Sequence, residues 1–269
     1  MVRKLPLVLA RKCSIGVVKK VCPMIMLYRF GFLGLLFGLW TLAAQQMGNN
    51  TVPSPNETLL AARRLIAEGQ LAAALADSLT VYLAGYAVAV AAAIPLGLAM
   101  GGFRVFGKTL EIFVFALAAT PRVAFIPLII VLLGLGIEAK MFIVFLGALM
   151  PILINTYAGV LAVDEELVEM AHSVGASRQR IFLQVVLPGS IPFIIVGLRL
   201  GATIGLINTV VAELYTAVKG LGGLLAIYGN SFRMAEYFVV VLTLAVVGVV
   251  VTEGLRYAEV RFSRWRPAH

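Results

Sequence analysis

Long apolar segments dominate this sequence and constrain its fold more than any other feature. A helix needs about 20 mostly apolar residues to cross the hydrocarbon core of a bilayer. Of the 269 residues, 61% are hydrophobic, against roughly 45–50% in soluble domains. The sequence therefore predicts an all-α integral membrane protein with about six transmembrane helices, at residues 24–44, 78–102, 109–133, 141–161, 189–211 and 237–257.

The third of these segments is interrupted. It contains Pro121, Arg122 and Pro127, and a proline inside a helix removes a backbone donor and clashes with the preceding turn. Irregular backbone at membrane depth is tolerated only where protein or water satisfies its polar groups. We therefore expect a broken or kinked passage packed against protein, in place of one straight helix.

The distribution of Lys and Arg predicts the orientation of the chain, because these residues are retained preferentially in short cytoplasmic loops. With both termini cytoplasmic, fourteen basic residues fall on the cytoplasmic side. Five fall on the outer side, at Arg63, Arg64, Lys140, Lys219 and Arg233, and three lie within apolar segments, at Arg29, Arg122 and Arg199. This imbalance favours an even number of spans with cytoplasmic N and C termini.

Both ends of the chain are predicted to be basic cytoplasmic tails, at residues 1–23 and 259–269. The apolar segment 24–44 follows a basic stretch, as in a signal peptide. It is longer than a typical apolar signal region of about 7–15 residues, so we expect an uncleaved anchor. Met24 and Met26 leave open the alternative that translation starts there and that residues 1–23 are not translated.

Residues 45–77 are predicted to form an external linker with an interfacial helix. The stretch 49–56, NNTVPSPN, is polar and contains prolines, which is typical of turns and extended backbone. Residues 58–76 return to a helical spacing of apolar residues, with a polarity that suits the membrane surface. The main transmembrane domain is then predicted to occupy residues 78–258.

The longest predicted cytoplasmic loop, residues 163–188, shows the pattern of a helix, a glycine and a second helix. Asp164 is a suitable N-cap for the first helix. Gly175 suits the left-handed conformation that ends many helices, and Ser177 can cap a second helix that runs to Val186. The first helix is predicted to have an apolar face, formed by Leu167, Val168, Ala171 and Val174.

This loop resembles the signature of binding-protein-dependent ABC importer permeases. That signature reads E-A-A, three residues, G, nine residues, I, one residue and L-P. The same spacing holds here for Glu169, Met170, Ala171, Gly175, Val185, Leu187 and Pro188, with Met170 in place of the second alanine and Val185 in place of isoleucine. Looser similarities after residue 50, such as TPRVAFIPL at 120–128, resemble the nitrate, sulfonate and taurine branch, which also includes permeases for thiamine precursors.

The resemblance implies a type I ABC importer transmembrane domain in a bacterial inner membrane. Glu169, Met170, Ala171, Gly175, Leu187 and Pro188 would then belong to a coupling loop that docks in a cleft of an ABC ATPase subunit. In this family two permease chains work with two ATPase subunits and a periplasmic solute-binding protein. The resemblance implies that ATP and Mg²⁺ bind to the ATPase subunit.

Polar side chains inside the apolar segments are candidates for the translocation path, because buried charge in a membrane is costly. The candidates are Arg122, Asn155, Asn208 and Glu213. Each has a structural alternative, an ion pair or interfacial position for the charged residues and an interhelical hydrogen bond for the amides. Arg199 is left between a lipid phosphate and a neighbouring helix as its partner. Gly201 and Gly205, four residues apart, predict close helix packing.

Other function classes find little support. The basic residues form no continuous stripe that would indicate nucleic-acid binding. The cysteines and histidines of the chain are Cys13, Cys22, His172 and His269. Their spacing matches neither a metal site nor a catalytic triad, so we predict no metal site and no catalytic residues. An ion-driven secondary transporter is typically built from two similar halves, and no such repeat is evident.

Overall fold

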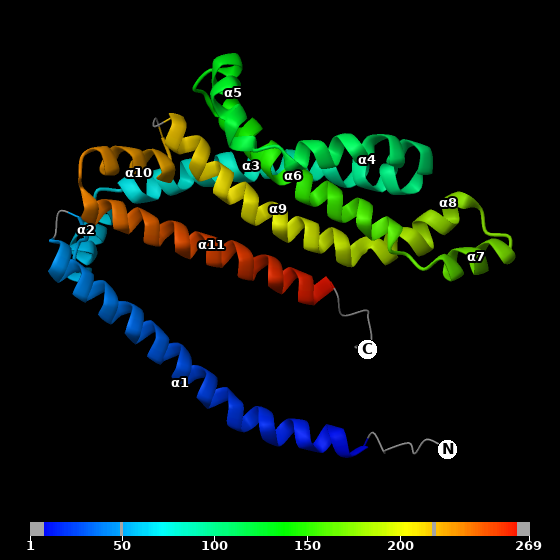
Figure 1. Ribbon diagram of the computed structural model, residues 1–269, viewed down its shortest axis with the longest axis horizontal. Coiled ribbons are helices and arrows are strands. Elements are labelled where there is room, and N and C mark those ends of the chain that lie inside the picture. The colour runs from blue at the N-terminus through cyan, green and yellow to red at the C-terminus, as the bar shows by residue number, and fades with distance from the viewer. Residues whose placement is uncertain (1–7, 49–50, 217–218, 263–269) are drawn as a thin grey trace.

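The structure is a computed structural model that describes residues 8–48, 51–216 and 219–262 (Figure 1). Every regular element in these ranges is a helix, which confirms the predicted fold class. The elements are α1 (Val8–Met47), α2 (Pro55–Ala67), α3 (Gln70–Gly102), α4 (Arg104–Ala119), η1 (Arg122–Phe125), α5 (Ile126–Leu133), α6 (Ile137–Leu161), α7 (Glu165–Ser173), α8 (Arg178–Ile181), η2 (Phe182–Val186), α9 (Leu187–Thr216), α10 (Leu221–Asn230) and α11 (Met234–Phe262).

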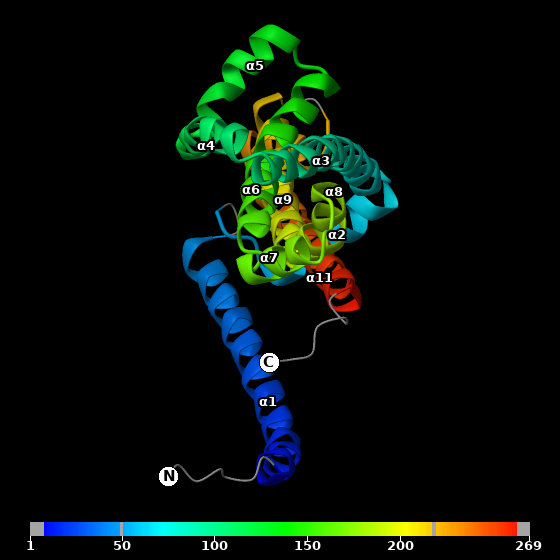
Figure 2. The same cartoon turned by 90° about the vertical axis from the view of Figure 1, so that its right-hand side faces the viewer.

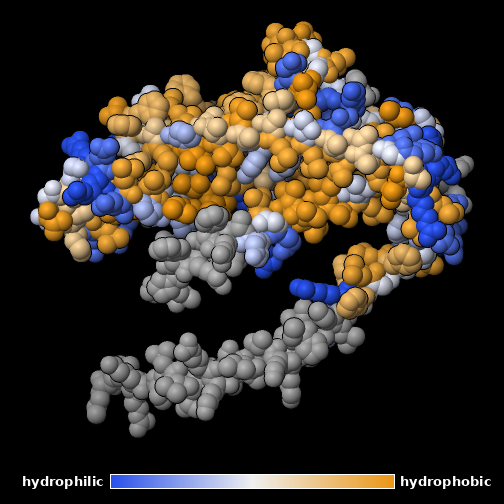
Figure 3. Space-filling model, turned by 180° about the vertical axis from the view of Figure 1, so that it is seen from behind, coloured by the Kyte–Doolittle hydropathy of each residue, from blue (hydrophilic) through white to orange (hydrophobic). Residues whose placement is uncertain are grey.

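Five helical stretches in the described ranges are long and apolar enough to cross a membrane. They are Tyr28–Met47 of α1, all of α3, all of α6, the continuous helix Arg178–Thr216, and Met234–Tyr257 of α11. A sixth passage is a bent pair, α4 followed by η1 and α5. The structure thus agrees with about six spans, and apolar side chains cover much of the bundle surface seen in Figure 3.

Short helices lie at both ends of the bundle, and the short helix α5 projects from its side (Figure 1). In Figure 1, α2 and α10 lie on the left and α7 and α8 on the right, and we name these the α2 end and the α7 end. The start of α1 and the end of α11 both lie toward the α7 end. This arrangement fits the even number of passages that the charge distribution favours.

Helices α3 and α6 pack closely through small residues. In α3 these recur at every fourth position, at Gly85, Ala89, Ala93, Gly97 and Gly101, and thus lie on one side of the helix. A Cβ atom on Gly97 would lie 2.7 Å from the Thr156 Cβ and 2.9 Å from the Leu153 carbonyl oxygen of α6. In lipid there is no hydrophobic driving force between helices, so their association depends on van der Waals contact. Small residues allow the two backbones to approach closely enough for such contact.

Helix α9 packs on the same central helix. A Cβ atom on Gly201 would lie 2.6 Å from the Ile152 Cγ1 of α6, and one on Gly205 would be in ordinary contact, 3.4 Å from the Tyr82 ring. The structure therefore places both glycines of the predicted small-residue pair at helix contacts. Two hydroxyls add to the packing: Tyr82 donates to the Ala202 carbonyl at 3.2 Å and Tyr86 to the Leu198 carbonyl at 2.9 Å.

The predicted break in the third span is present, but its second half has little packing within this chain. The axes of α4 and η1–α5 differ by 83°, and the chain turns at Thr120 and Pro121. Of α5, Ile126 and Ile129 are buried in a cluster with residues of α6 and α9. Val131 and Leu132 are 81% and 72% exposed. The expectation of a passage packed against protein therefore holds for one face only.

The predicted interfacial helix 58–76 is divided in two. Gly69, in the left-handed region with φ of 71°, separates α2 from α3, so the second half of that range extends the next span. Helix α2 begins earlier than predicted, at Pro55, because Ser54 and Glu57 form a capping box. At the chain ends, residues 8–23 and 259–262 of the predicted tails are helical.

Helix α1 is held to the bundle near its C-terminal end. The Trp40 ring stacks on Phe238 of α11 with 5.9 Å between centroids, and its Nε1 donates to the Pro53 carbonyl at 3.0 Å. Further toward its N-terminus, side chains such as Phe32 are exposed, and Figure 2 shows α1 departing from the other helices. One face of this span is therefore left to lipid or to another chain.

We predict that Gly97→Ala destabilises the bundle. A helix interior normally gains about 0.5–1 kcal/mol from this change, but here the methyl group would meet the backbone of α6, which costs about 1–3 kcal/mol. Thermal unfolding of the purified protein in detergent measures the difference. The control is Gly34→Ala on α1, where no atom lies within 4 Å of the added methyl; equal midpoints for the two variants would contradict the prediction.

Candidate functional site

The predicted first helix of the loop is α7, and its N-terminus is capped as expected. Asp164 has extended backbone, and its side chain accepts a hydrogen bond from the Glu166 amide at 3.0 Å. Glu165 and Glu166 lie in the first turn, where the helix dipole favours negative charge. The loop therefore contains a short helix that is stabilised locally.

The turn after α7 also follows the prediction. Gly175 has φ of 78°, a conformation that costs a residue with a Cβ about 1–2 kcal/mol. The Ala176 amide donates to the Ala171 carbonyl at 3.1 Å and the Gly175 amide to His172 at 2.9 Å, which satisfies the last carbonyls of the helix. Ser177 then caps α8 by accepting from the Arg180 amide.

Helix α7 has apolar side chains that are exposed on the surface of the molecule. No residue of α7 is buried. Leu167, Met170 and Val174 are 50%, 64% and 80% exposed, and their spacing of three and four residues places them on one face. The predicted apolar face is therefore divided, because Val168 and Ala171 are half-buried on the side toward the bundle.

A cavity of about 650 Å³ lies between α7 and the ends of α3, α6 and α8–η2. Its wall combines apolar residues such as Val160 and Phe182 with Glu169, His172 and Arg178. Glu169, the first residue of the predicted signature, thus borders an open space at the α7 end. Helix α7 borders this cavity and lies at the end of the molecule (Figure 1).

The second loop helix was predicted to end at Val186. In the structure it continues into the fifth span. Residues Arg178–Thr216 form one helical stretch. Phe182–Val186 has π-helical geometry, with the Leu187 amide donating to the Phe182 carbonyl. Pro188 has no amide hydrogen to donate, and the wide turn that precedes it lets the helix pass this position. Leu187 and Pro188 therefore lie within a continuous rod.

Two of the predicted translocation residues meet at one glycine of α6. The half-buried Arg122 of η1 donates from Nη1 to the Gly147 carbonyl at 2.9 Å. The Asn208 amide of α9 packs against the Cα side of the same glycine, where a Cβ would collide with it. Asn208 also donates to the Ile204 carbonyl of its own helix at 2.8 Å. The structure thus brings Arg122 and Asn208 together.

Asn155 and Arg199 lie apart from this pair. Asn155 is half-buried and donates to the Pro151 carbonyl, one turn back in α6, and its Cβ lies where Gly197 of α9 leaves room. Arg199 is also half-buried, on α9. Both are at helix surfaces within the membrane-spanning part.

Glu213 is fully buried at the α2 end, where it holds three elements together. Its carboxylate accepts from the Ser78 hydroxyl of α3 at 2.8 Å and from the Gly222 amide of α10 at 2.9 Å. Ser78 Oγ in turn accepts from the Leu221 amide at 2.8 Å. The carboxylate therefore lies at the N-terminus of α10, a favourable place for negative charge. These contacts give Glu213 a role in holding the fold together.

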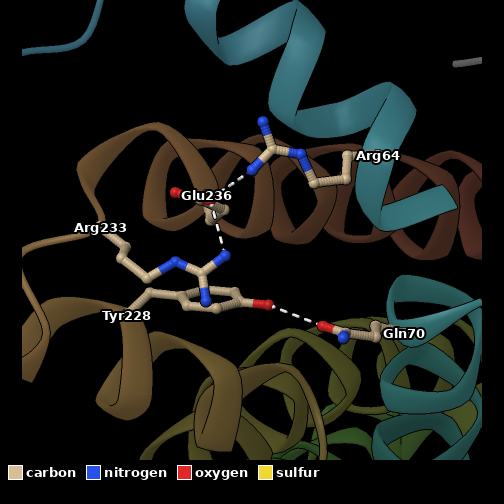
Figure 4. A network of polar contacts seen from close by, with 5 residues as sticks. All are labelled: Arg64, Gln70, Tyr228, Arg233 and Glu236. Carbon is tan, nitrogen blue, oxygen red and sulfur yellow. Dashed lines mark hydrogen bonds and ion pairs between the residues drawn. The ribbon is translucent and has the colours of Figure 1, made fainter. Parts of the chain in front are cut away.

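A second polar network closes the α2 end (Figure 4). Glu236 of α11 pairs with Arg233 at 2.7 Å and with Arg64 of α2 at 3.6 Å. The Arg233 guanidinium lies over the Tyr228 ring, 4.8 Å from its centroid, and Tyr228 donates to Gln70 of α3 at 3.1 Å. The hydrogen bond to Glu236 raises the pKa of Arg233. Helices α2, α3, α10 and α11 are thus joined by one chain of contacts.

The sequence reasoning missed several polar residues that the structure places at helix contacts. Glu111 of α4 accepts from the Tyr157 hydroxyl of α6 at 3.4 Å. Lys140 was recognised only as an outer basic residue, yet it is 5% exposed and donates to the Lys219 carbonyl at 3.2 Å. Neither residue lies in a recognisable motif. The sequence indicates only that each is a charged residue at an apolar segment. Among the described residues, no group of His, Cys, Asp and Glu is arranged to hold a metal ion.

Comparison with known proteins assigns the family. Residues 93–262 match the family described as binding-protein-dependent transport system inner membrane component. A probable ABC transporter permease of Brucella abortus is 34% identical over 219 residues, or 81% of this chain and 88% of the relative. A putative aliphatic sulfonates transport permease of Escherichia coli is 34% identical, and the match covers 87% of this chain and 90% of the relative. The taurine transport system permease of the same bacterium is 30% identical, and the match covers 86% of each chain.

Solved structures agree on the fold. A chain of the inward-facing MetNI methionine ABC transporter superimposes with a TM-score of 0.61 at 17% identity, covering 70% of this chain and 94% of the other. The chain therefore belongs to the family of binding-protein-dependent transport system inner membrane components, and it is an ABC importer permease of the nitrate, sulfonate and taurine branch. It is a multi-pass membrane component of a transporter.

We predict that Ser78→Ala loosens the α2 end. The change would leave the buried Leu221 amide without an acceptor and would remove the Ser78 donor from Glu213, whose carboxylate keeps the Gly222 amide. An unsatisfied buried group costs about 1–3 kcal/mol. Thermal unfolding and hydrogen exchange of the α10 amides report the loss. Thr80→Ala, on the exposed side of α3 where the hydroxyl bonds only to the Ala76 carbonyl, should leave both unchanged; a variant pair with the same exchange rates would contradict this role for Ser78.

Proposed function

We propose that this permease imports a small solute, namely nitrate, a sulfonate, taurine or a related compound such as a thiamine precursor, in a bacterial inner membrane. A periplasmic solute-binding protein delivers the solute at the α2 end. An ABC ATPase subunit binds at the α7 end, which is then cytoplasmic together with both termini, and it holds the ATP and Mg²⁺. The named relatives, a putative aliphatic sulfonates permease, a taurine permease and a nitrate import permease, support this set of solutes.

The observation that carries the proposal is the exposed helix α7. It is capped by Asp164 at one end and stopped by Gly175 at the other, so it can transmit force without unwinding. Its exposed face of Leu167, Met170 and Val174 suits an apolar cleft on a partner. Glu169, exposed beside that face, can form a charge-assisted hydrogen bond with an Arg or Lys of the ATPase.

The connection from α7 into the membrane is stiff. After the turn at Gly175, the continuous helix Arg178–Thr216 extends for about 1.5 Å per residue, farther than the hydrocarbon core of about 30 Å. Its membrane part is packed on α6 through Gly197 and Gly201. A displacement of the docked loop by the ATPase therefore shifts α9 against α6, and this is the step we propose to open the path.

We predict that Glu169→Arg and Gly175→Val separate the permease from its ATPase without preventing membrane insertion. The first reverses a charge at the docking face, and the second forces a branched residue into the left-handed region. Affinity purification from mildly solubilised membranes followed by mass spectrometry should find a stoichiometric ATPase with the wild type and at least a tenfold loss with each variant. Solute uptake should fall with it.

The matched control is Glu68→Arg, which reverses an exposed carboxylate at the opposite, α2 end. It should retain the ATPase. Recovery of the ATPase with both loop variants at the wild-type level would contradict docking through α7, and its absence from the wild type in several detergents would contradict the proposal as a whole.

We further propose that Arg122, Asn208 and Asn155 border the translocation path. The Arg122 guanidinium uses Nη1 for the Gly147 carbonyl and has five N–H donors in all, so it can contact the oxygens of an anionic solute in passage. A second permease copy would complete the path. Its contact surface on this chain includes the apolar side of α5, where Val131 and Leu132 are exposed.

We predict that Arg122→Gln lowers uptake of an anionic solute by about tenfold or more, the effect of losing one charge-assisted hydrogen bond, while the ATPase still copurifies. Radiolabelled uptake in cells measures the rate. Arg29→Gln is the control, since Arg29 is an exposed arginine on the loosely attached α1. Unchanged uptake in the Arg122 variant would remove this residue from the path.

A further inference from the structure

A separate cavity of about 310 Å³ lies at the α2 end, among the ends of the three core helices. Its lining includes Asp77 of α3, Lys140 at the start of α6, Glu213 near the end of α9, and Lys219 beyond it. Its volume is at the lower limit of ligand pockets, which measure roughly 300–1,000 Å³. The cavity thus has room for a small solute.

The charged residues of the cavity lie near the ends of their helices. Helix α3 has 33 residues and is therefore about 50 Å long, which exceeds the hydrocarbon core of about 30 Å. Asp77 lies in its second turn, Lys140 in the first turn of α6, and Glu213 in the last turn of α9. The charged groups are therefore near the membrane surface on the side where the proposed binding protein delivers its solute.

Lys140 is the buried cation of the cavity. The residue is 5% exposed, and its ammonium donates to the Lys219 carbonyl at 3.2 Å. An ammonium has three donors, so two remain for a ligand. In the described part of the chain Lys140 forms no ion pair with a carboxylate, and the oxygens of Glu213 are already bonded to Ser78 and Gly222.

Asp77 supplies the opposite charge. It is exposed, lines the same cavity, and forms no ion pair with any described residue. Together Lys140, Lys219, Asp77 and Glu213 carry two positive and two negative formal charges. A plain anion would gain contacts with Lys140 but would be repelled by Asp77, and a plain cation would meet the reverse. A ligand with both charges has a partner for each.

We propose that this cavity binds a small zwitterion, with a sulfonate or carboxylate group on Lys140 and an ammonium group on Asp77. The inference rests on the proposed function and narrows its solute class. Among the solutes considered there, an aminosulfonate has a charge partner for both Lys140 and Asp77, whereas nitrate and alkanesulfonates leave Asp77 without one. The Lys219 side chain, exposed at the rim, adds a second cation on the anionic side of the ligand.

Competition binding on the purified full chain in lipid nanodiscs tests the proposal. Radiolabelled taurine is the probe, and unlabelled taurine, β-alanine, isethionate and ethanolamine are the competitors; isethionate replaces the ammonium of taurine by a hydroxyl, and ethanolamine lacks the sulfonate. Taurine and β-alanine should compete at least about tenfold better than the two singly charged analogues, as expected for one charge-assisted hydrogen bond. Equal competition by isethionate, or no retention of taurine by the wild type, would overturn the proposal.

Two variants assign the contacts. Asp77→Asn should lower taurine affinity to that of isethionate, about tenfold, and leave isethionate affinity unchanged or higher. Lys140→Met should remove binding of both. Lys140 is buried, so its variant can lose stability, and the exposed Asp77 therefore gives the decisive test. If Asp77→Asn still binds taurine more tightly than isethionate, by the same factor as the wild type, the proposed site is refuted. Glu68→Gln, an exposed carboxylate of the same end outside the cavity, is the control.

The outcome can be separated from that of the proposed function. Asp77→Asn leaves α7 untouched, so copurification of the ATPase should be the same as for the wild type. A chain that binds its ATPase but not the zwitterion would retain the importer function and lose only this inference.

Discussion

Close contact among α3, α6 and α9 is the constraint on which the rest of this structure depends. Within a bilayer the lipid is as apolar as the helices, so association relies on shape and on hydrogen bonds. The contacts at Gly97, Gly201 and Gly205, together with the hydroxyls of Tyr82 and Tyr86, meet that requirement. The other spans surround this core more loosely, and α1 is largely exposed.

Polar groups in the structure differ in how much of their hydrogen-bonding capacity the chain itself uses. At the α2 end, Glu213 and Glu236 join helices that are distant in sequence, and their oxygens are bonded to protein groups. Deeper in the bundle, Arg122 uses only part of its donor capacity within the chain. Unused bonding capacity thus separates groups that hold the fold from groups available to a solute.

Local sequence signals predicted local structure well. The caps at Asp164 and Ser177 and the left-handed Gly175 depend on residues within a few positions of each other, and the spans follow from long apolar runs. The helix break at Gly69 was missed because the apolar spacing continues on both sides of it. The continuity of α8 with α9 was missed because Pro188 usually ends a helix, and nothing local reveals the wide turn before it.

Contacts between distant segments could not be predicted from the sequence. Ser78 and Glu213 are separated by 135 residues, and only the three-dimensional arrangement shows that both cap α10. The meeting of Arg122 and Asn208 at Gly147 is of the same kind. Each residue was a candidate on its own, but its partner depends on how α6 packs, which a single sequence does not state.

The π-helical turn at Phe182–Val186 sets the rotational phase of the fifth span. An α-helix advances about 100° per residue, so the extra residue in this turn rotates everything after it relative to α8. Gly197 and Gly201 face α6 only at the present phase. The π-helical turn therefore fixes the rotation of the loop relative to the span, and in the proposed coupling motion it determines which face of α9 moves against α6.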